Sequence, residues 1–414
     1  MAKKQRVQAA QGSLKGETIK RLSSAWRQFQ LKDLIAPFIF LTLFLPAKIF
    51  KIANHLKHRK LWLVAEEGEA RDNGYYFYKH VREQHSDDFC FYAIKKISKD
   101  YQKVAKLGNV INFGSLKHWF YYLAADLNIS SQKSGNPNPI FFYFLHVVCK
   151  LYNNRVFLQH GIIKDDAKWV YFSKTRFKYF VCGTPEEYNY VKTTFGYPEG
   201  NVILTGLPRW DSLDNQEVKK TIILVMPTWR SWLGKDFNGL HQIKDFRATE
   251  YYQRWNSFLH SQKLLRLAEA QNLQIYFYPH ANMQKFLGYF QSPNQHVKII
   301  DQRACDIQTA LKTSALLVTD YSSVFMDFAY LEKPSVYYQF DEQEYRKKQY
   351  QQGYFDYRKN GFGDVCTTED EVVEKIIQSA KNGFKIEPEY HKRSQNFFTL
   401  KDQQNSERVY EAIK

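Results

Sequence analysis

The sequence has few cysteines, and none of them is placed for pairing or for metal binding. The five residues are scattered and odd in number: Cys90, Cys149, Cys182, Cys305 and Cys366. Neither a disulfide framework nor a zinc site follows from this spacing. The pattern is typical of a protein that works in a reducing compartment.

Several motifs that would announce a cofactor or metal are also missing. The chain has no Walker A loop, no Gly-x-Gly-x-x-Gly, no His-Glu-x-x-His and no Cys-x-x-Cys. It also lacks the Asp-x-Asp pair that would favour a metal-dependent transferase. The absence of these motifs argues against a dinucleotide enzyme, and we predict no metal and no cofactor.

Long apolar runs are missing except for one near the N-terminus. Residues 34–47 form an apolar stretch of 14 residues that contains Pro37 and Pro46. A spanning helix needs about 20 apolar residues, and some 30 mostly polar residues precede this run, unlike a signal peptide. We therefore expect it neither to span a membrane nor to be cleaved.

Positive charge surrounds this run. Residues 1–60 hold 13 Lys and Arg against two acidic residues, and the whole chain carries a net charge of +17. A basic, amphipathic segment of this kind favours binding in the interface of an anionic membrane. The alternative is a core helix of the first domain with a solvated basic tail.

The whole chain has 414 residues, of which 44% are hydrophobic. It is therefore long enough for two domains. Short apolar runs alternate with helical stretches, which indicates parallel sheets. Strands are predicted in the first half at 61–65, 89–94, 110–113, 155–159, 177–182 and 202–205. In the second half they are predicted at 221–226, 274–278, 297–300, 315–319 and 335–340.

These patterns predict an α/β fold with two doubly wound domains that face a cleft. We expect a first domain at 61–212 and a second at 217–367, joined by a polar linker near 211–220. A helical segment at 368–414 is expected to pack back across the first domain. Ligands of such sheets bind beyond the carboxyl ends of the strands, so the cleft is the expected site.

Histidines stand at two predicted strand exits. His160 is followed by Gly161 and by the carboxylates Asp165 and Asp166, which suits a general base oriented by an acidic neighbour. His280 follows Pro279 at the end of another strand. A structural role for either histidine is an equally open alternative.

Two further clusters suggest an anion site. Asp320, Ser322 and Ser323 follow a strand and precede an apolar helical pattern, so the serines lie where backbone N–H groups are free. Arg230, close after Thr228 behind another strand, supplies a cation for a phosphate. A plain helix cap and a solvated surface arginine are the alternatives.

Together these clusters resemble the CDP-glycerol glycerophosphotransferase family of teichoic acid and capsule polymer synthesis. Beyond the residues above, the resemblance rests on 205–211, 227–230, 319–323, 332–337, 353–356 and 361–363, within a match from about residue 61 to the C-terminus. Gln159 and Ile162 stand where many members carry Trp and Thr or Ala.

The resemblance implies a GT-B arrangement and a peripheral membrane enzyme at the cytoplasmic face of the cell membrane. The enzyme would transfer glycerol phosphate or a related polyol phosphate from a CDP-activated donor to a lipid-linked acceptor, releasing CMP. His160, Asp165 and His280 would be catalytic. The donor would be held by Thr228, Arg230, His280, Asp320, Ser322 and Ser323.

Two other functions stay open at this stage. A GT-B glycosyltransferase that uses a nucleotide sugar would share the fold and the pyrophosphate site. A non-enzymatic nucleic-acid-binding protein would fit the charge of +17. However, that charge is concentrated beside the apolar run, and no RNA-binding aromatic signature is present, so we expect no nucleic-acid partner.

Overall fold

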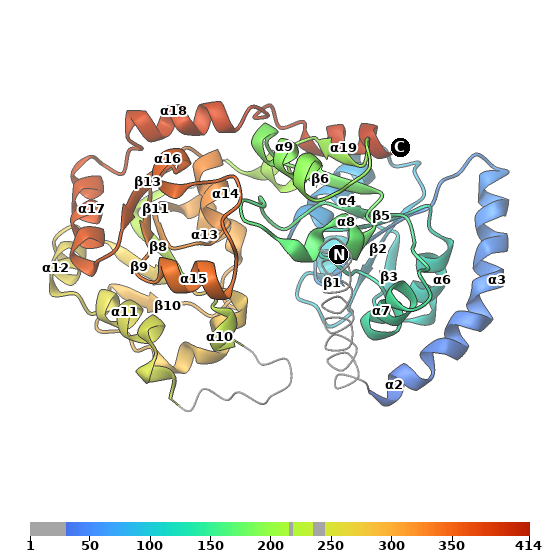
Figure 1. Cartoon of the computed structure of the whole chain (residues 1–414), viewed down its shortest axis with the longest axis horizontal. Coiled ribbons are helices and arrows are strands. Elements are labelled where there is room, and N and C mark those ends of the chain that lie inside the picture. Colours follow the sequence, from blue (N-terminus) through green and yellow to red (C-terminus); the bar gives the residue numbers. More distant parts are fainter. Residues whose placement is uncertain (1–29, 215–217, 235–244) are drawn as a thin grey trace, which may run out of the picture.

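The computed structural model describes residues 30–214, 218–234 and 245–414. Within these ranges the chain forms two α/β halves that lie side by side (Figure 1). Two predicted features lie partly outside the described residues: the basic arm at 1–29 and the linker at 215–217.

The first half is built on a seven-stranded parallel sheet with the order β3-β2-β1-β4-β5-β6-β7. The apolar β1 and β2 are almost completely buried, as expected for strands with helices on both faces. The strands are β1 (Trp62–Gly68), β2 (Cys90–Ile94), β3 (Val110–Asn112), β4 (Leu127–Ser130), β5 (Arg155–Phe157), β6 (Tyr179–Cys182) and β7 (Val202–Leu204).

The second half repeats the plan in a six-stranded parallel sheet with the order β10-β9-β8-β11-β12-β13. Every residue of its central strand β11 is buried. The strands are β8 (Lys219–Met226), β9 (Gln274–Phe277), β10 (Val297–Ile299), β11 (Ser314–Thr319), β12 (Ser335–Tyr338) and β13 (Gly363–Cys366). The predicted class of two doubly wound, Rossmann-like domains is confirmed.

Several helices start at a residue whose side chain accepts a hydrogen bond from the first helical turn. Examples are Asp72 before α4 (Asn73–Gln84) and Thr368 before α17 (Glu369–Lys381). The other helices of the first half are α5 (Tyr101–Ala105), α6 (Leu116–Ala124), α7 (Pro139–Val147), α8 (Phe172–Thr175) and α9 (Pro185–Thr194). Those of the second half are α10 (Ser231–Gly234), α11 (Glu250–Leu259), α12 (Gln262–Ala270), α13 (Ile307–Thr313), α14 (Val324–Tyr330), α15 (Glu342–Lys348) and α16 (Tyr357–Asn360).

The apolar N-terminal run forms a longer helix than the sequence suggested. The short α2 (Leu31–Leu34) is followed by α3 (Ala36–His55), which has 20 residues and carries Pro37 in its first turn. Helix α3 runs along the outer edge of the first half (Figure 1). It is apolar rather than basic and amphipathic, which corrects the predicted character of this segment. By length and composition alone α3 could cross a membrane, so the expectation that the run is too short is also wrong.

The C-terminal helices join the two halves. α17 packs on β12 and β13 of the second sheet, α18 (Pro388–Phe397) follows it, and α19 (Asn405–Ile413) lies against α4 of the first half (Figure 1). Asp211 fixes the start of α19 by accepting hydrogen bonds from the backbone N–H groups of Asn405 and Ser406 at 2.9 and 2.7 Å.

A buried ion pair joins the two halves near the cleft. The Arg209 guanidinium donates to both carboxylate oxygens of Asp327 on α14, and also to Asp72 of the first half at 2.7 Å. Trp210 donates its indole N–H to Asp327 at 2.7 Å and stacks on Tyr330. These contacts fix how the carboxyl ends of the two sheets face each other.

Candidate active site

Two hollows open between the carboxyl ends of the two sheets, and they share four residues. One has a volume of about 150 Å³ and the other of about 560 Å³. His160, His280, Ser322 and Ser323 line both. The place where the hollows meet is therefore the candidate reacting centre, where two substrates could touch.

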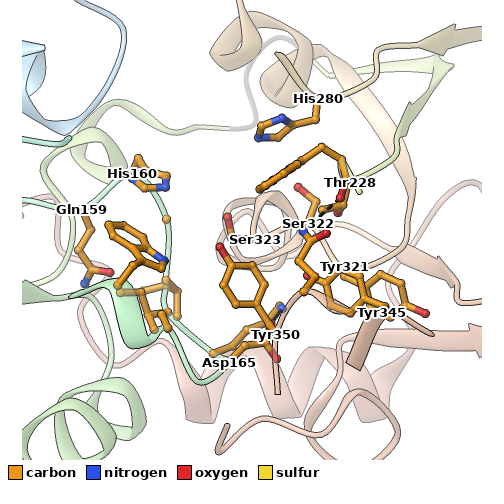
Figure 2. Close-up of a pocket in the computed structure, with 18 of the residues that line it drawn as sticks. Gln159, His160, Asp165, Thr228, His280, Tyr321, Ser322, Ser323, Tyr345 and Tyr350 are labelled. Carbon is orange, nitrogen blue, oxygen red and sulfur yellow. Dashed lines mark hydrogen bonds and ion pairs between the residues drawn. The ribbon is translucent and has the colours of Figure 1, made fainter. Parts of the chain in front are cut away.

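His160 leaves β5 through a strained turn. The preceding Gln159 is fully buried and has a φ of 63°, a left-handed conformation that is uncommon for a non-glycine residue. The Asn73 side chain donates to the Gln159 carbonyl at 2.8 Å and holds this turn in place. As a result the His160 side chain is exposed and points into the cleft (Figure 2).

The environment of His160 favours one tautomer. Its Nδ1 lies 3.4 Å from the Ser131 carbonyl, which can only accept a hydrogen bond. This contact favours the tautomer with the proton on Nδ1, which leaves the Nε2 lone pair facing the cleft. The ring also stacks on Trp169, with centroids 6.0 Å apart. Such an imidazole can accept a proton from a substrate hydroxyl.

A buried carboxylate supports the segment that holds His160. Glu66, at the end of β1, accepts hydrogen bonds from the Ser131 hydroxyl and from the Gly74 N–H. Burial, and then the charge of Asp72, raises the pKa of Glu66 to about 7. Ser131 follows β4, a strand that we did not predict because its four residues include a polar asparagine. Its role was therefore missed.

His280 has the opposite tautomer. Its Nδ1 accepts a hydrogen bond from the Asn282 N–H at 3.2 Å, so the proton of the neutral ring is on Nε2. Burial, and then the neighbouring His160, lowers the pKa of His280 to about 4. The ring is therefore neutral near pH 7 and offers a hydrogen-bond donor rather than a positive charge. It faces the His160 side of the cleft (Figure 2).

The two serines follow β11, at the point where the halves touch. Ser323 stands at the N-cap position of α14 but makes no side-chain cap bond, so the simple helix-cap interpretation does not describe it. A Cβ on Gly161 would come within 2.5 Å of the Ser323 hydroxyl. Glycine at 161 therefore lets the His160 loop approach Ser323 closely.

Arg230 and Asp320 lie beneath the hollows rather than on their walls. Arg230 is fully buried and pairs with Asp320 at 2.8 Å and with Asp341 at 2.7 Å. Burial alone would lower the pKa of Arg230, but the two carboxylates raise it well above its usual value. The prediction that these two residues touch the donor is corrected, because their charges are already satisfied.

Their role is to position Thr228. Asp320 accepts a hydrogen bond from the Thr228 N–H at 2.8 Å, and Arg230 donates to the Thr228 carbonyl at 3.0 Å. The Thr228 hydroxyl is buried at the wall of the smaller hollow, and it has no hydrogen-bond partner within the described part of the chain. It is thus available to a ligand.

Asp165 does not orient His160 in the way the sequence suggested. Its carboxylate pairs with Lys164 and with Arg346 of α15, the latter at 2.5 Å. A backbone bridge from Asp165 to Gln352 joins the same loop to the second half. The predicted catalytic role of Asp165 is therefore corrected. Asp165 fixes the position of the loop after His160, which lies between the halves.

Aromatic side chains on the smaller hollow were also missed. Trp169, Trp229, Tyr345 and Tyr350 line it. Tyr345 stacks on Tyr321, with centroids 3.9 Å apart. Apart from Trp229, which lies within the motif at 227–230, no local motif marks these residues, and the fold brings them together from separate segments.

The fold is that of two Rossmann-like domains in a GT-B-like arrangement, with a cleft between the carboxyl ends of their sheets. Residues 47–414 match the family model described as CDP-Glycerol:Poly(glycerophosphate) glycerophosphotransferase. Because the match covers most of the sequence, the chain belongs to this family.

Individual relatives agree with this assignment. The chain is 33% identical over 373 residues to the minor teichoic acid biosynthesis protein GgaB of Bacillus subtilis (strain 168), covering 88% of this chain and 40% of that protein. It is 34% identical over 108 residues to a teichoic acid poly(glycerol phosphate) polymerase of the same organism, covering 26% of this chain and 14% of the polymerase. The chain thus spans less than half the length of these relatives.

A solved structure shares the fold. The wall teichoic acid polymerase TagF superposes with a TM-score of 0.60 at 13% identity, covering 93% of this chain and 98% of that one. A TagF variant soaked with CDPG matches with a TM-score of 0.59. At this level of identity the likeness shows a common fold.

Proposed function

We propose that the protein transfers glycerol phosphate, or a related polyol phosphate, from CDP-glycerol to a hydroxyl of a membrane-linked acceptor. CMP is released, and the product belongs to teichoic acid or capsule polymer synthesis. The observation that carries this proposal is that His160 and His280 face one cleft and that their backbone contacts favour opposite tautomers. A proton acceptor on His160 and a proton donor on His280 face one cleft.

The reaction assigns a role to each group. The acceptor oxygen attacks the glycerol-linked phosphorus and forms a new P–O bond, while its proton passes to His160 Nε2. The P–O bond to CMP breaks, and CMP leaves as an anion. Phosphoryl transfer depends mainly on positioning and charge stabilisation.

Neutral donors hold the phosphates in this proposal. His280 Nε2–H and the hydroxyls of Thr228, Ser322 and Ser323 lie at or beside the junction of the hollows. Each hydrogen bond to an ionised phosphate is stronger than a neutral one. We propose that transfer needs no metal and no cofactor.

The two hollows give each substrate its own approach. The larger one, of about 560 Å³, lies within the range of sites that bind small molecules and cofactors. Donor and acceptor can then meet at His160 from opposite sides, because both hollows reach this residue.

Helix α3 supports attachment to a membrane surface. One stripe of it packs on the first half through residues such as Leu43, Ala47 and Phe50. A second apolar stripe is left uncovered and consists of Phe38, Leu41, Leu45, Ile49, Ile52 and Leu56. The helix therefore suits an orientation in the membrane plane, with the protein body on one side.

Charge and cysteines favour the cytoplasmic face. The 13 cations of residues 1–60 would meet anionic lipid there. All five cysteines are free, as expected in a reducing compartment. We propose a peripheral protein with an anionic membrane surface and a lipid-linked acceptor as partners.

A turnover assay tests the function. The protein is incubated with CDP-glycerol, CDP-ribitol or a nucleotide sugar, each with a lipid-linked primer analogue, and the products are weighed by mass spectrometry. We expect the mass of one or more polyol phosphates to be added, with CMP released. Transfer of a sugar would support the glycosyltransferase alternative. Binding of nucleic acid without turnover of any donor would support a non-enzymatic nucleic-acid-binding protein.

A further inference from the structure

A cluster of metal-binding side chains lies outside the two hollows. His80 on α4, His85 just after that helix, and Glu407 in the first turn of α19 bring their ligand atoms within 4.8 Å of one another. Both imidazole Nε2 atoms approach the same carboxylate oxygen, at 2.6 and 2.9 Å. The mechanism uses none of these three residues.

Packing helps to hold His85 and Glu407 in place. The His85 ring stacks on Tyr410 of α19, with centroids 3.7 Å apart and planes at 8°. The start of α19 is anchored by Asp211, and Arg408 donates to the Thr205 carbonyl at 2.9 Å. Glu407 is therefore presented to the histidines by a helix that is fixed independently of them.

We propose that His80, His85 and Glu407 form a site for a divalent transition-metal ion of the zinc class. Two imidazole nitrogens and one carboxylate oxygen are ligands that Zn²⁺ accepts, whereas Mg²⁺ and Ca²⁺ prefer oxygen ligands alone. All three side chains are partly exposed, so water can complete the coordination.

The nitrogen-to-oxygen distances need only a small adjustment. Tetrahedral ligands about 2.0–2.1 Å from Zn²⁺ lie about 3.3 Å from one another. The present nitrogen-to-oxygen distances of 2.6 and 2.9 Å would therefore lengthen by about half an ångström as the ion replaces the shared hydrogen bonds. A side-chain rotation at the partly exposed Glu407 can provide this.

The ion would act as a clasp. The chain reaches α19 from the second half, through α17 and α18, and α19 then lies on α4 of the first half. A metal bound between α4 and α19 stabilises this return of the C-terminus and so stabilises the folded protein. It would not enter the phosphoryl transfer, which we propose to be metal-free.

Calorimetric titration tests the site directly. The full chain is freed of metal by dialysis against a chelator and then titrated with Zn²⁺. We expect one ion per chain, and we expect His80→Ala and Glu407→Gln each to weaken binding at least about tenfold. The matched control is His391→Ala, because His391 also pairs with a glutamate, Glu332 at 2.9 Å, but has no second histidine in the described cluster.

Two further readouts make the result independent of how well the variants fold. Co²⁺ added to the wild-type protein should give visible absorption bands typical of nitrogen and oxygen ligands in a low-coordinate site. Zn²⁺ should also raise the melting temperature of the wild type and of His391→Ala, but not that of His80→Ala. Absence of Zn²⁺ binding and of Co²⁺ bands in the wild type, or equal affinity in all four proteins, would overturn the proposal.

Discussion

At the scale of single residues, the reacting centre depends on which nitrogen of each histidine carries the proton. A backbone carbonyl favours Nδ1–H on His160, and a backbone N–H favours Nε2–H on His280. The lowered pKa of His280, about 4, keeps it neutral at physiological pH. One ring is thus prepared to accept a proton while the other is prepared to donate a hydrogen bond.

The donor contacts can be tested by affinity. We expect His280→Ala and Ser323→Ala each to weaken CDP-glycerol binding by about 1.5–3 kcal/mol, the scale of hydrogen bonds to charged groups. Isothermal titration calorimetry measures the affinity for CDP-glycerol. His391→Ala serves as the control, because His391 lines neither hollow. Unchanged affinity in both variants would place the donor elsewhere.

The close approach of the halves at Gly161 gives a second test. In Gly161→Ala the new methyl group would meet the Ser323 hydroxyl at 2.5 Å, so the serine or the His160 loop must shift. We expect turnover to fall by at least about tenfold, since displacements of about 1 Å at a reacting centre are costly. Gly288→Ala is the matched control, because a Cβ there meets nothing within 4 Å. Equal turnover in the two variants would show that this contact is unimportant.

Sequence reasoning found residues that the fold brings together at the cleft, but it misjudged the residues that support them. His160, His280, Ser322 and Ser323 each follow a buried strand, and parallel strands bring such positions to one edge. Arg230 and Asp320 share the same local pattern, yet they are buried beneath the pocket wall and pair with each other. Only the packing of α15, whose N-cap residue is Asp341, decides that difference.

At the scale of elements, helix α3 shows how one helix can have two apolar faces. Its inner stripe contacts α6 and α7, as in the ring contact of Phe50 with Phe120 at 5.2 Å. Its outer stripe is exposed, with Leu41 at 70% and Leu45 at 64%. Asp126 also accepts from Lys51 and His55 near the end of α3, which keeps the helix docked.

We expect this outer stripe to bind vesicles. The double variant Leu41→Glu and Leu45→Glu should float with anionic vesicles much less than the wild type, because charge cannot be buried in the acyl region. Added salt should weaken wild-type flotation, since each basic residue near the surface contributes about 1 kcal/mol.

The control changes exposed apolar residues elsewhere, as in the double variant Ile97→Glu and Leu151→Glu; these residues are 92% and 52% exposed. Flotation that is equal in the wild type and in both double variants would show that α3 is not the attachment surface.

The errors at this scale have physical causes. β4 and β13 were missed because both are four-residue strands that include polar or glycine residues. The helical pattern of residues 251–272 is divided between α11 and α12, since the chain turns at His260 and Ser261. Helix α3 continues through Pro46, which the sequence pattern treated as an interruption.

At the scale of the whole molecule, the arrangement of the halves depends on buried charge. Arg209 bridges Asp72 of the first half and Asp327 of the second, and all three groups are largely shielded from water. Burial alone would lower the pKa of Arg209, but these carboxylates raise it above its usual value. The sequence marks 205–211 as a motif, but its interdomain role is visible only in the fold.

Breaking this bridge should loosen the molecule. Arg209→Met leaves Asp327 buried without its partner, so we expect a loss of about 3–5 kcal/mol in the free energy of unfolding. Adding Asp327→Asn to Arg209→Met should recover part of that loss, because the uncompensated charge is removed. Urea denaturation followed by fluorescence checks both. A single variant as stable as the wild type would contradict the account.

The central claim is that His160 takes the acceptor proton during transfer from CDP-glycerol. The most direct measurement compares CMP release by the wild type and by His160→Ala, using CDP-glycerol and a primer analogue, while calorimetry monitors donor binding. The account predicts a fall in turnover of about 10²–10⁴-fold with donor affinity nearly unchanged. Near-normal turnover in His160→Ala would contradict it.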